Sequence, residues 1–150
     1  MECVNGFFQR LSSATEYPLV KARLYIDGEL KGELLLLVDT GAGVTSISYR
    51  DALRLGLTNI VKRGPRRKVV GVSGTAQERV LAGTIELELF DESNVLRLRL
   101  SSVTVAEKPR QHGKDFNLAL QRPSILGWDA LKNTVITVDY GKKLVQICLP

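Results

Sequence analysis

Apolar and polar residues alternate along much of this chain of 150 residues, and this period of two predicts β-strands. Residues 20–26 carry apolar side chains at every second position, and Asp27-Gly28 after them is a typical hairpin turn. Segment 34–38 is instead an unbroken apolar run, Leu-Leu-Leu-Leu-Val. A strand with that pattern is expected to be buried on both faces. It ends at Asp39, so we expect this carboxylate at the end of a rigid strand.

A second hairpin is predicted where two segments that alternate apolar and charged residues flank a polar turn at 91–94. Folding the chain there places Glu88 opposite Arg97 and Glu86 opposite Arg99. Opposite charges across a strand pair contribute a few tenths to about 1 kcal/mol each and favour one register. We interpret both pairs as structural.

Helical segments are short in this sequence. Ser48 with Asp51 three residues later is the pattern of a capping box, which predicts a helix that stops at Gly56. A second short helix is predicted at 128–132. Further strands are expected at 69–72, 75–80, 103–105, 134–138 and 144–149. This pattern predicts an all-β fold, a closed or nearly closed barrel with one or two short helices.

Two parts of the chain differ in pattern. Residues 17–150 are long enough to form one domain with a real core. Residues 1–16 show no clear period, and we interpret them as an N-terminal arm. Phe7, Phe8 and Leu11 would let this arm dock on a surface such as a neighbouring subunit, or it packs loosely.

Composition is that of an ordinary soluble globular protein, with 44% hydrophobic and 25% charged residues. No apolar run approaches the roughly 20 residues that cross a bilayer, and the N-terminus lacks the pattern of a signal peptide. We therefore expect a cytoplasmic protein with no membrane contact. Cys3 and Cys148 could pair if the chain ends meet. Without a secretory signal, we expect two free or buried thiols instead.

Metal and histidine chemistry are not indicated. The single histidine, His112, falls in a polar loop at 108–117, and no Cys/His group has metal-ligand spacing, so we expect no metal and no cofactor. The net charge of +5 and a basic loop at 58–68 would attract acidic partners. Few aromatic side chains that could stack on bases accompany the basic residues of that loop, so nucleic acid is not the expected partner.

Asp39 and its small neighbours are the strongest candidates for chemistry. A carboxylate at the end of a buried strand is costly to ionise without partners, and such groups are often functional. Thr40, Gly41 and Ala42 follow it, and small residues let other backbone or a ligand come close. Taken alone, an Asp-Thr-Gly sequence more commonly marks an aspartate that caps its own turn, here through the amides of Thr40 and Gly41.

The motif Asp39-Thr40-Gly41-Ala42 after an apolar strand resembles the active-site loop of the retropepsin-like aspartic proteases, the family typified by retroviral proteases. Two further motifs stand in the family's order. A glycine-bearing hairpin occupies the place of the family's flap, and Ile125-Leu126-Gly127 resembles the segment that closes the core beneath the catalytic loop. The hairpin residues are Gly71, Val72, Ser73, Gly74 and Thr75. The chain is longer than a minimal retroviral protease, and its hairpin carries fewer glycines.

The resemblance implies an aspartic endopeptidase that works as a homodimer. Two carboxyl groups about 3 Å apart share a proton, so one can activate water while the other polarises the peptide carbonyl. Repulsion between two bare charges there is on the order of 5 kcal/mol at an effective dielectric of about 20, which keeps one of them protonated. Asp-Thr-Gly occurs once in this chain. An active form therefore needs Asp39 from two copies across a twofold axis.

The resemblance also implies individual roles. Thr40 would join the two loops through hydroxyl-to-backbone hydrogen bonds, and Gly41 would let the backbone pack against the dyad. The Gly41 carbonyl, with Ala42 beside it, would position the substrate backbone. The flap, 71–75, would close over an extended peptide. The last strand could add to a dimer sheet.

Alternatives from other classes stay open. The fold could serve as a non-catalytic dimerisation or peptide-binding module, or as a basic β domain that binds nucleic acid. Salt-sensitive oligonucleotide binding that survives Asp39→Asn would favour the latter. A dinucleotide site at 41–43 is not expected, because Val44 and Thr45 are β-formers where that site needs a helix.

Overall fold

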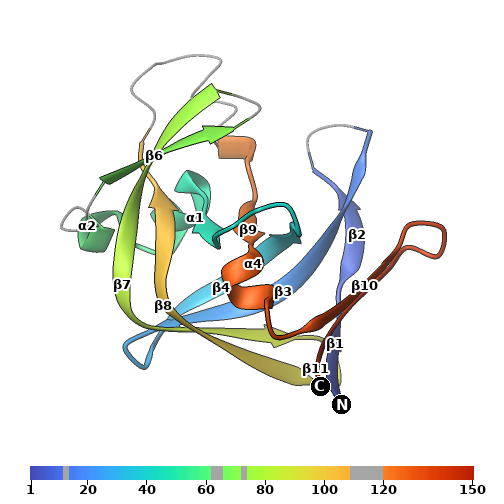
Figure 1. The fold of residues 1–150 in the computed structure, drawn as a ribbon. Helices are drawn as coiled ribbons and strands as arrows, with labels where there is room; N and C mark the ends of the chain where they lie inside the picture. The colour runs from blue at the N-terminus through green and yellow to red at the C-terminus, as the bar shows by residue number, and fades with distance from the viewer. Residues whose placement is uncertain (12–13, 62–65, 72–73, 109–119) are drawn as a thin grey trace.

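The computed structural model describes residues 1–11, 14–61, 66–71, 74–108 and 120–150 (Figure 1). β-Strands dominate these residues, and the helices are single turns or little more. The strands are β1 (Glu2–Asn5), β2 (Phe7–Arg10), β3 (Glu16–Ile26), β4 (Glu29–Val38), β5 (Ser46–Ile47), β6 (Arg66–Gly71), β7 (Gly74–Phe90), β8 (Val95–Ala106), β9 (Ser124–Leu126), β10 (Val135–Asp139) and β11 (Leu144–Leu149). The helices are α1 (Tyr49–Arg54), α2 (Thr58–Val61) and α4 (Trp128–Leu131).

The larger sheet closes on itself. Its eight strands run in the order β2-β3-β4-β9-β5-β8-β7-β6, and an additional pairing joins β3 to β7. Because β3 pairs with both β4 and β7, the strands from β3 round to β7 form a barrel. The all-β barrel that the sequence predicts is confirmed. The β6–β7 hairpin lies at one end of the molecule and the chain termini lie at the other, with α4 between them (Figure 1).

The first hairpin, β3–β4, forms where the sequence predicts it. Asp27 and Gly28 both have positive φ, 50° and 82°, as a two-residue hairpin turn requires. The apolar run in β4 differs from its prediction. Leu34, Leu36 and Val38 are buried, whereas the alternate residues Leu35 and Leu37 are only half-buried. Only one face of β4 meets the barrel interior, so the run is not buried on both faces.

The β7–β8 hairpin has the predicted register. Glu88 pairs with Arg97 and Glu86 with Arg99. Arg97 Nε lies 3.3 Å from Glu88 Oε2 and 3.7 Å from Glu86 Oε1. The Glu88 carboxylate is buried and also binds Arg23 from β3, at 2.9 Å. These ion pairs therefore act within the barrel wall, as the sequence analysis interprets them.

Helix α1 begins at the predicted cap, where Ser48 Oγ accepts the Asp51 N–H at 3.2 Å. The reciprocal bond of a capping box is absent among the described residues. Ser48 N–H donates instead to Ser124 Oγ at 2.9 Å, and Asp51 Oδ2 accepts from the same hydroxyl at 2.6 Å. The predicted loop at 58–68 is also partly wrong, because α2 and the first residues of β6 fall within it.

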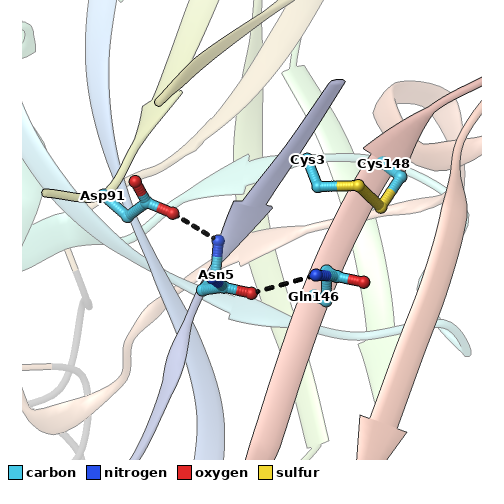
Figure 2. Close-up of a disulfide and its surroundings, with 5 residues drawn as sticks. All are labelled: Cys3, Asn5, Asp91, Gln146 and Cys148. Carbon is cyan, nitrogen blue, oxygen red and sulfur yellow. Dashed lines mark hydrogen bonds between the residues drawn. A yellow bond between two sulfur atoms is a disulfide. The ribbon is translucent and has the colours of Figure 1, made fainter. Parts of the chain in front are cut away.

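The smaller sheet joins the two ends of the chain in the order β1-β11-β10. Cys3 lies directly opposite Cys148 in the antiparallel β1–β11 pair, and the two form a disulfide with a Cα–Cα distance of 4.0 Å (Figure 2). The expectation of free thiols is therefore wrong, since the termini meet in space. Residues 1–16, interpreted as an arm, contain β1 and β2, and β2 pairs with β3.

The structure bears only partly on the expectations for the histidine loop, the membrane and the location. His112 and most of the polar loop at 108–117 lie outside the described residues. Within the described residues, no helix has both the length and the apolar character needed to cross a membrane. A cytoplasmic location stays a prediction, and an in-chain disulfide is more typical of oxidising compartments.

Candidate active site

Asp39 stands where β4 leaves the barrel. Val38 pairs with Leu126 of the parallel strand β9, and Asp39 N–H donates to Leu126 C=O at 3.2 Å. The Asp39 side chain is half-buried, and its Oδ1 accepts the Gly41 N–H at 3.0 Å. Ala42 N–H donates back to Asp39 C=O at 3.2 Å, which closes a tight turn. The carboxylate thus does cap its own turn, while Thr40 and Gly41 stay exposed beside it.

Helix α4 holds the far side of this loop. Trp128 N–H donates to Ala42 C=O at 2.8 Å, and Asp129 N–H donates to Gly43 C=O at 3.3 Å. Asp129 Oδ1 also accepts both the N–H and the hydroxyl of Thr45, at 2.8 and 2.7 Å. The first turn of α4 therefore fixes the loop through main-chain and side-chain bonds together.

Gly127 allows the close approach of these two segments. A Cβ atom built there would lie 2.4 Å from both the carbonyl carbon and oxygen of Val44, and 2.9 Å from Thr45 N. Gly127 N–H donates to Thr45 Oγ1 at 3.1 Å. The position thus needs glycine for space, since the opposing atoms are backbone and cannot move aside.

The structure brings the first and third sequence motifs together. Ile125 pairs with Leu37 of β4 on one side and with Ser46 of β5 on the other, so β9 underlies the loop that joins those strands. The second motif is described only in part. Gly71 and Gly74 pair at the end of the β6–β7 hairpin, which continues through Thr75, whereas Val72 and Ser73 lie outside the described residues.

Glu78 is a residue that the sequence analysis did not single out. It is buried on β7, four residues after Gly74, and its Oε1 accepts the Ser46 hydroxyl at 2.9 Å. Its Oε2 has no hydrogen-bond partner in the described part of the chain. This contact ties the β6–β7 hairpin to the strand that follows the Asp39 loop. A glutamate in a strand carries no local signal that it will point inward.

The structure also has a pocket away from Asp39. A pocket of about 360 Å³ lies between the outer side of β4 and α1, and none of its lining residues belongs to the loop. Its polar lining comes from Lys21, Glu33, Arg50, Asp51 and Arg54. Among the residues that the structure covers, no group of three or more histidine, cysteine or acidic side chains is placed to hold a metal ion.

This chain matches a known protein family over most of its length. The family model described as "Aspartyl protease" matches residues 22–130, a span from β3 through the Asp39 loop to α4. The chain belongs to the aspartyl protease family. A solved structure shows that this aspartyl protease has a retropepsin-like fold. The crystal structure of a retropepsin-like aspartic protease from Rickettsia conorii aligns over 99% of this chain and 92% of that chain, with a TM-score of 0.57 and 15% identity.

A second solved structure is the EIAV protease in complex with the inhibitor HBY-793. It aligns over 83% of this chain and 92% of that chain, with a TM-score of 0.41 and 18% identity. No curated protein sequence matches this aspartyl protease. The family match over residues 22–130 and the fold shared with the Rickettsia conorii protease confirm the family and the retropepsin-like fold that the sequence motifs indicate.

Proposed function

We propose that this aspartyl protease is an endopeptidase whose catalytic dyad is Asp39 from each of two copies of the chain. One observation carries the proposal. The Asp39 loop is held on one side by β9 and on the other by α4, while Thr40 and Gly41 remain exposed. A rigidly held carboxylate with exposed small neighbours is the arrangement that a symmetric dyad requires.

The proposed chemistry uses two carboxyl groups that share one proton. The ionised group takes a proton from a bound water, and the water oxygen attacks the peptide carbonyl carbon. The protonated group donates to the carbonyl oxygen, so a neutral tetrahedral intermediate forms. Its C–N bond then breaks as the nitrogen takes the proton that the first carboxyl group gained from water. One hydroxyl of the intermediate gives a proton to the second carboxylate, so the shared proton is restored, and a free carboxyl and a free amine leave the site.

The neighbouring residues take supporting roles in this proposal. Thr40 links the two loops, Gly41 lets the backbone lie against the dyad, and Ala42 orients the substrate. Gly127 and the segment Ile125–Leu126 support the loop from below. The hairpin that contains 71–75 covers an extended peptide, and its link to β5 through Glu78 supports that position.

The decisive experiment compares wild type with Asp39→Asn for cleavage of an unstructured protein between pH 4 and 7. We expect Asp39→Asn to lose nearly all cleavage, because an amide can neither take a proton from water nor share one with its partner. Asp27→Asn is the matched control, because Asp27 also lies in a turn. Its carboxylate likewise accepts one backbone N–H, that of Thr84 on β7, at 3.0 Å. Equal cleavage by Asp39→Asn and wild type would contradict the proposal.

The mass of the active species completes that experiment. A shared dyad requires activity to follow the concentration of a dimer. A protein that is fully active as a monomer of 16.6 kDa would contradict the dyad even if Asp39 proves essential.

A further inference from the structure

Glu78 carries a buried carboxylate to which the proposed chemistry gives no part. The residue is 8% exposed, and its Oε1 accepts the Ser46 hydroxyl at 2.9 Å. Its Oε2 is also buried and has no hydrogen-bond partner among the described residues. A buried carboxylate costs free energy unless its charge is compensated. The unpartnered oxygen is therefore a place where a cation would bind favourably.

The register of the sheet places this carboxylate on the same face as Asp39. Side chains at paired positions of neighbouring strands point to the same face, and so do alternate residues along one strand. Asp39 follows Leu37 by two residues, and its N–H continues the ladder to β9 by donating to Leu126 C=O. Leu37 is paired with Ile125 on β9, and Ile125 with Ser46 on β5. This row leads from Asp39 to the hydroxyl that the buried carboxylate accepts.

A second set of pairings gives the same result. Ser46 is also paired with Thr104 on β8, and Thr104 is paired with Val80 on β7. Val80 lies two residues after Glu78 on the same strand, and no register shift separates them. Their side chains therefore share a face. Both sets of pairings and the direct hydrogen bond agree that the Glu78 carboxylate belongs to the face that carries Asp39.

This face points away from the hydrophobic core and is partly open. Leu37, Ile125 and Ser46 are only half-buried. The residues that follow each of them point the other way, into the core cluster: Val38, Leu126 and Ile47. A peptide whose scissile bond lies at Asp39 would therefore lie along this face, with the buried carboxylate at its side.

The spacing of the strands sets how far along the peptide the carboxylate acts. Ser46 stands on β5, and β9 separates β5 from β4. Two spacings of about 4.8 Å put the carboxylate on the order of 10 Å from β4. An extended peptide that runs across these strands advances about 3.3 Å per residue. The side chain that meets the carboxylate is thus two or three residues from the cleaved bond.

We propose that Glu78, held in place by Ser46, binds a lysine or arginine side chain of the substrate two or three residues from the cleaved bond. The ammonium or guanidinium group would donate a charge-assisted hydrogen bond to Oε2, while the Ser46 hydroxyl stays on Oε1. This inference rests on the proposed function for the peptide substrate. It goes further in naming the substrate class and the residue that selects it.

The first test compares peptides that differ at one position. Each pair carries lysine or methionine, which are similar in length, two or three residues before or after the cleaved bond. At one of these positions we expect kcat/KM of wild type to be at least about tenfold higher for the lysine peptide, as for one hydrogen bond to a charged group. Arginine should also be preferred over methionine there. Equal values for lysine and methionine at every one of these positions would overturn the proposal.

Substitution of the carboxylate should remove the preference. In Glu78→Gln the ratio of the two kcat/KM values should fall to about 1, because the amide keeps an oxygen for the Ser46 hydroxyl but loses the charge. The ratio is taken within one variant, so a general loss of activity does not change it. Glu86→Gln is the matched control on β7, since its carboxylate already pairs with Arg97 and Arg99. A lysine preference that survives Glu78→Gln, or that is lost equally in Glu86→Gln, would contradict the proposal.

A cation from the chain itself is the competing explanation. Arg67 on β6 stands opposite Glu78 in the register of the β6–β7 hairpin. Under the proposal, Arg67→Gln keeps the lysine preference of wild type. A preference that appears only in Arg67→Gln would mean that Arg67, and not the substrate, compensates the carboxylate, which contradicts the proposal.

Peptide binding by Asp39→Asn separates failure of this inference from failure of the proposed function. Fluorescence anisotropy of labelled peptides should show that this variant binds the lysine peptide about tenfold more tightly than the methionine peptide and cleaves neither. If wild type cleaves nothing but this binding preference exists and is lost in Asp39→Asn/Glu78→Gln, the lysine site is retained and the protease is removed. Cleavage that needs Asp39 but shows no lysine preference would retain the protease and remove the lysine site. A protein that neither binds nor cleaves these peptides would contradict both.

Discussion

Asp129 accepts two hydrogen bonds from one residue, Thr45, which lies 84 positions earlier in the chain. Both bonds, 2.8 Å from the backbone N–H and 2.7 Å from the hydroxyl, end on the same carboxylate oxygen. Thr45 closes the loop that starts at Asp39, and Asp129 lies in the first turn of α4. This contact therefore fixes the loop to a helix that sequence distance alone would leave unconnected.

Removal of the Asp129 carboxylate should loosen that loop. We expect Asp129→Ala to lower the free energy of unfolding by about 1.5–3 kcal/mol, the usual loss for hydrogen bonds to a charged group. Asp129→Asn keeps an acceptor oxygen and should lose less. Urea unfolding measures both effects, and cleavage assays should show a larger loss of activity in the alanine variant. Equal stability of the alanine variant and wild type would mean that these bonds do not hold the loop.

Gly127 should tolerate no side chain. The added Cβ of Gly127→Ala would meet the backbone of Val44 at 2.4 Å, so α4 or the loop must shift. We expect a loss of about 1–3 kcal/mol in the free energy of unfolding, as for overpacked interiors. Gly43→Ala in the same loop is the control, because no atom lies within 4 Å of its added Cβ. If both variants melt at the wild-type temperature, the two backbones do not approach as closely as described.

The carboxyl group of Asp91 should make the thermal stability of the fold depend on pH. The backbone N–H of Asn5 lowers the pKa of this carboxyl below its ordinary value of 3.8, as do those of Ser93 and Asn94, while partial burial opposes them. A carboxyl with a lowered folded pKa stabilises the fold above its unfolded pKa, and this contribution is lost as pH falls through the folded value. Wild type should therefore melt above Asp91→Asn at pH 7, and the difference should shrink below pH 3.8. Thermal unfolding from pH 2 to 7 measures it, with exposed Glu92→Gln as control. A constant difference across that range would contradict the assignment.

The Cys3–Cys148 disulfide closes nearly the whole chain into a loop, with a sequence separation of 145. Loss of so long a loop constraint should lower the free energy of unfolding by about 3–5 kcal/mol. Cys3→Ala/Cys148→Ala and reduced wild type should show the same loss in urea unfolding. Stability that reductant leaves unchanged in wild type would mean that the bond does not form in solution.

The local features of this aspartyl protease were predictable from its sequence. The Asp27-Gly28 turn, the Ser48 cap and the Glu88–Arg97 register each depend on residues within about ten positions of one another, and all three are confirmed. The family was predictable because three motifs keep their order along the chain. The roles of Asp39 and of the hairpin at 71–75 remain predictions.

Contacts between distant segments were not predictable in the same way. Cys3 meets Cys148 only because the smaller sheet pairs β1 with β11. Ser124 replaces part of the predicted capping box, and Glu78 turns inward to Ser46, because the barrel brings their strands together. Hydrophobic alternation states which face of a strand is buried, but not which strand lies beside it. The sequence by itself determined the β3–β4 and β7–β8 hairpins, the start of α1 and the family of this protein, but not β1, β2 or α2. The tertiary structure alone decided the hydrogen bonds between Thr45 and Asp129 and the pairing of Cys3 with Cys148, because both join segments far apart in the chain.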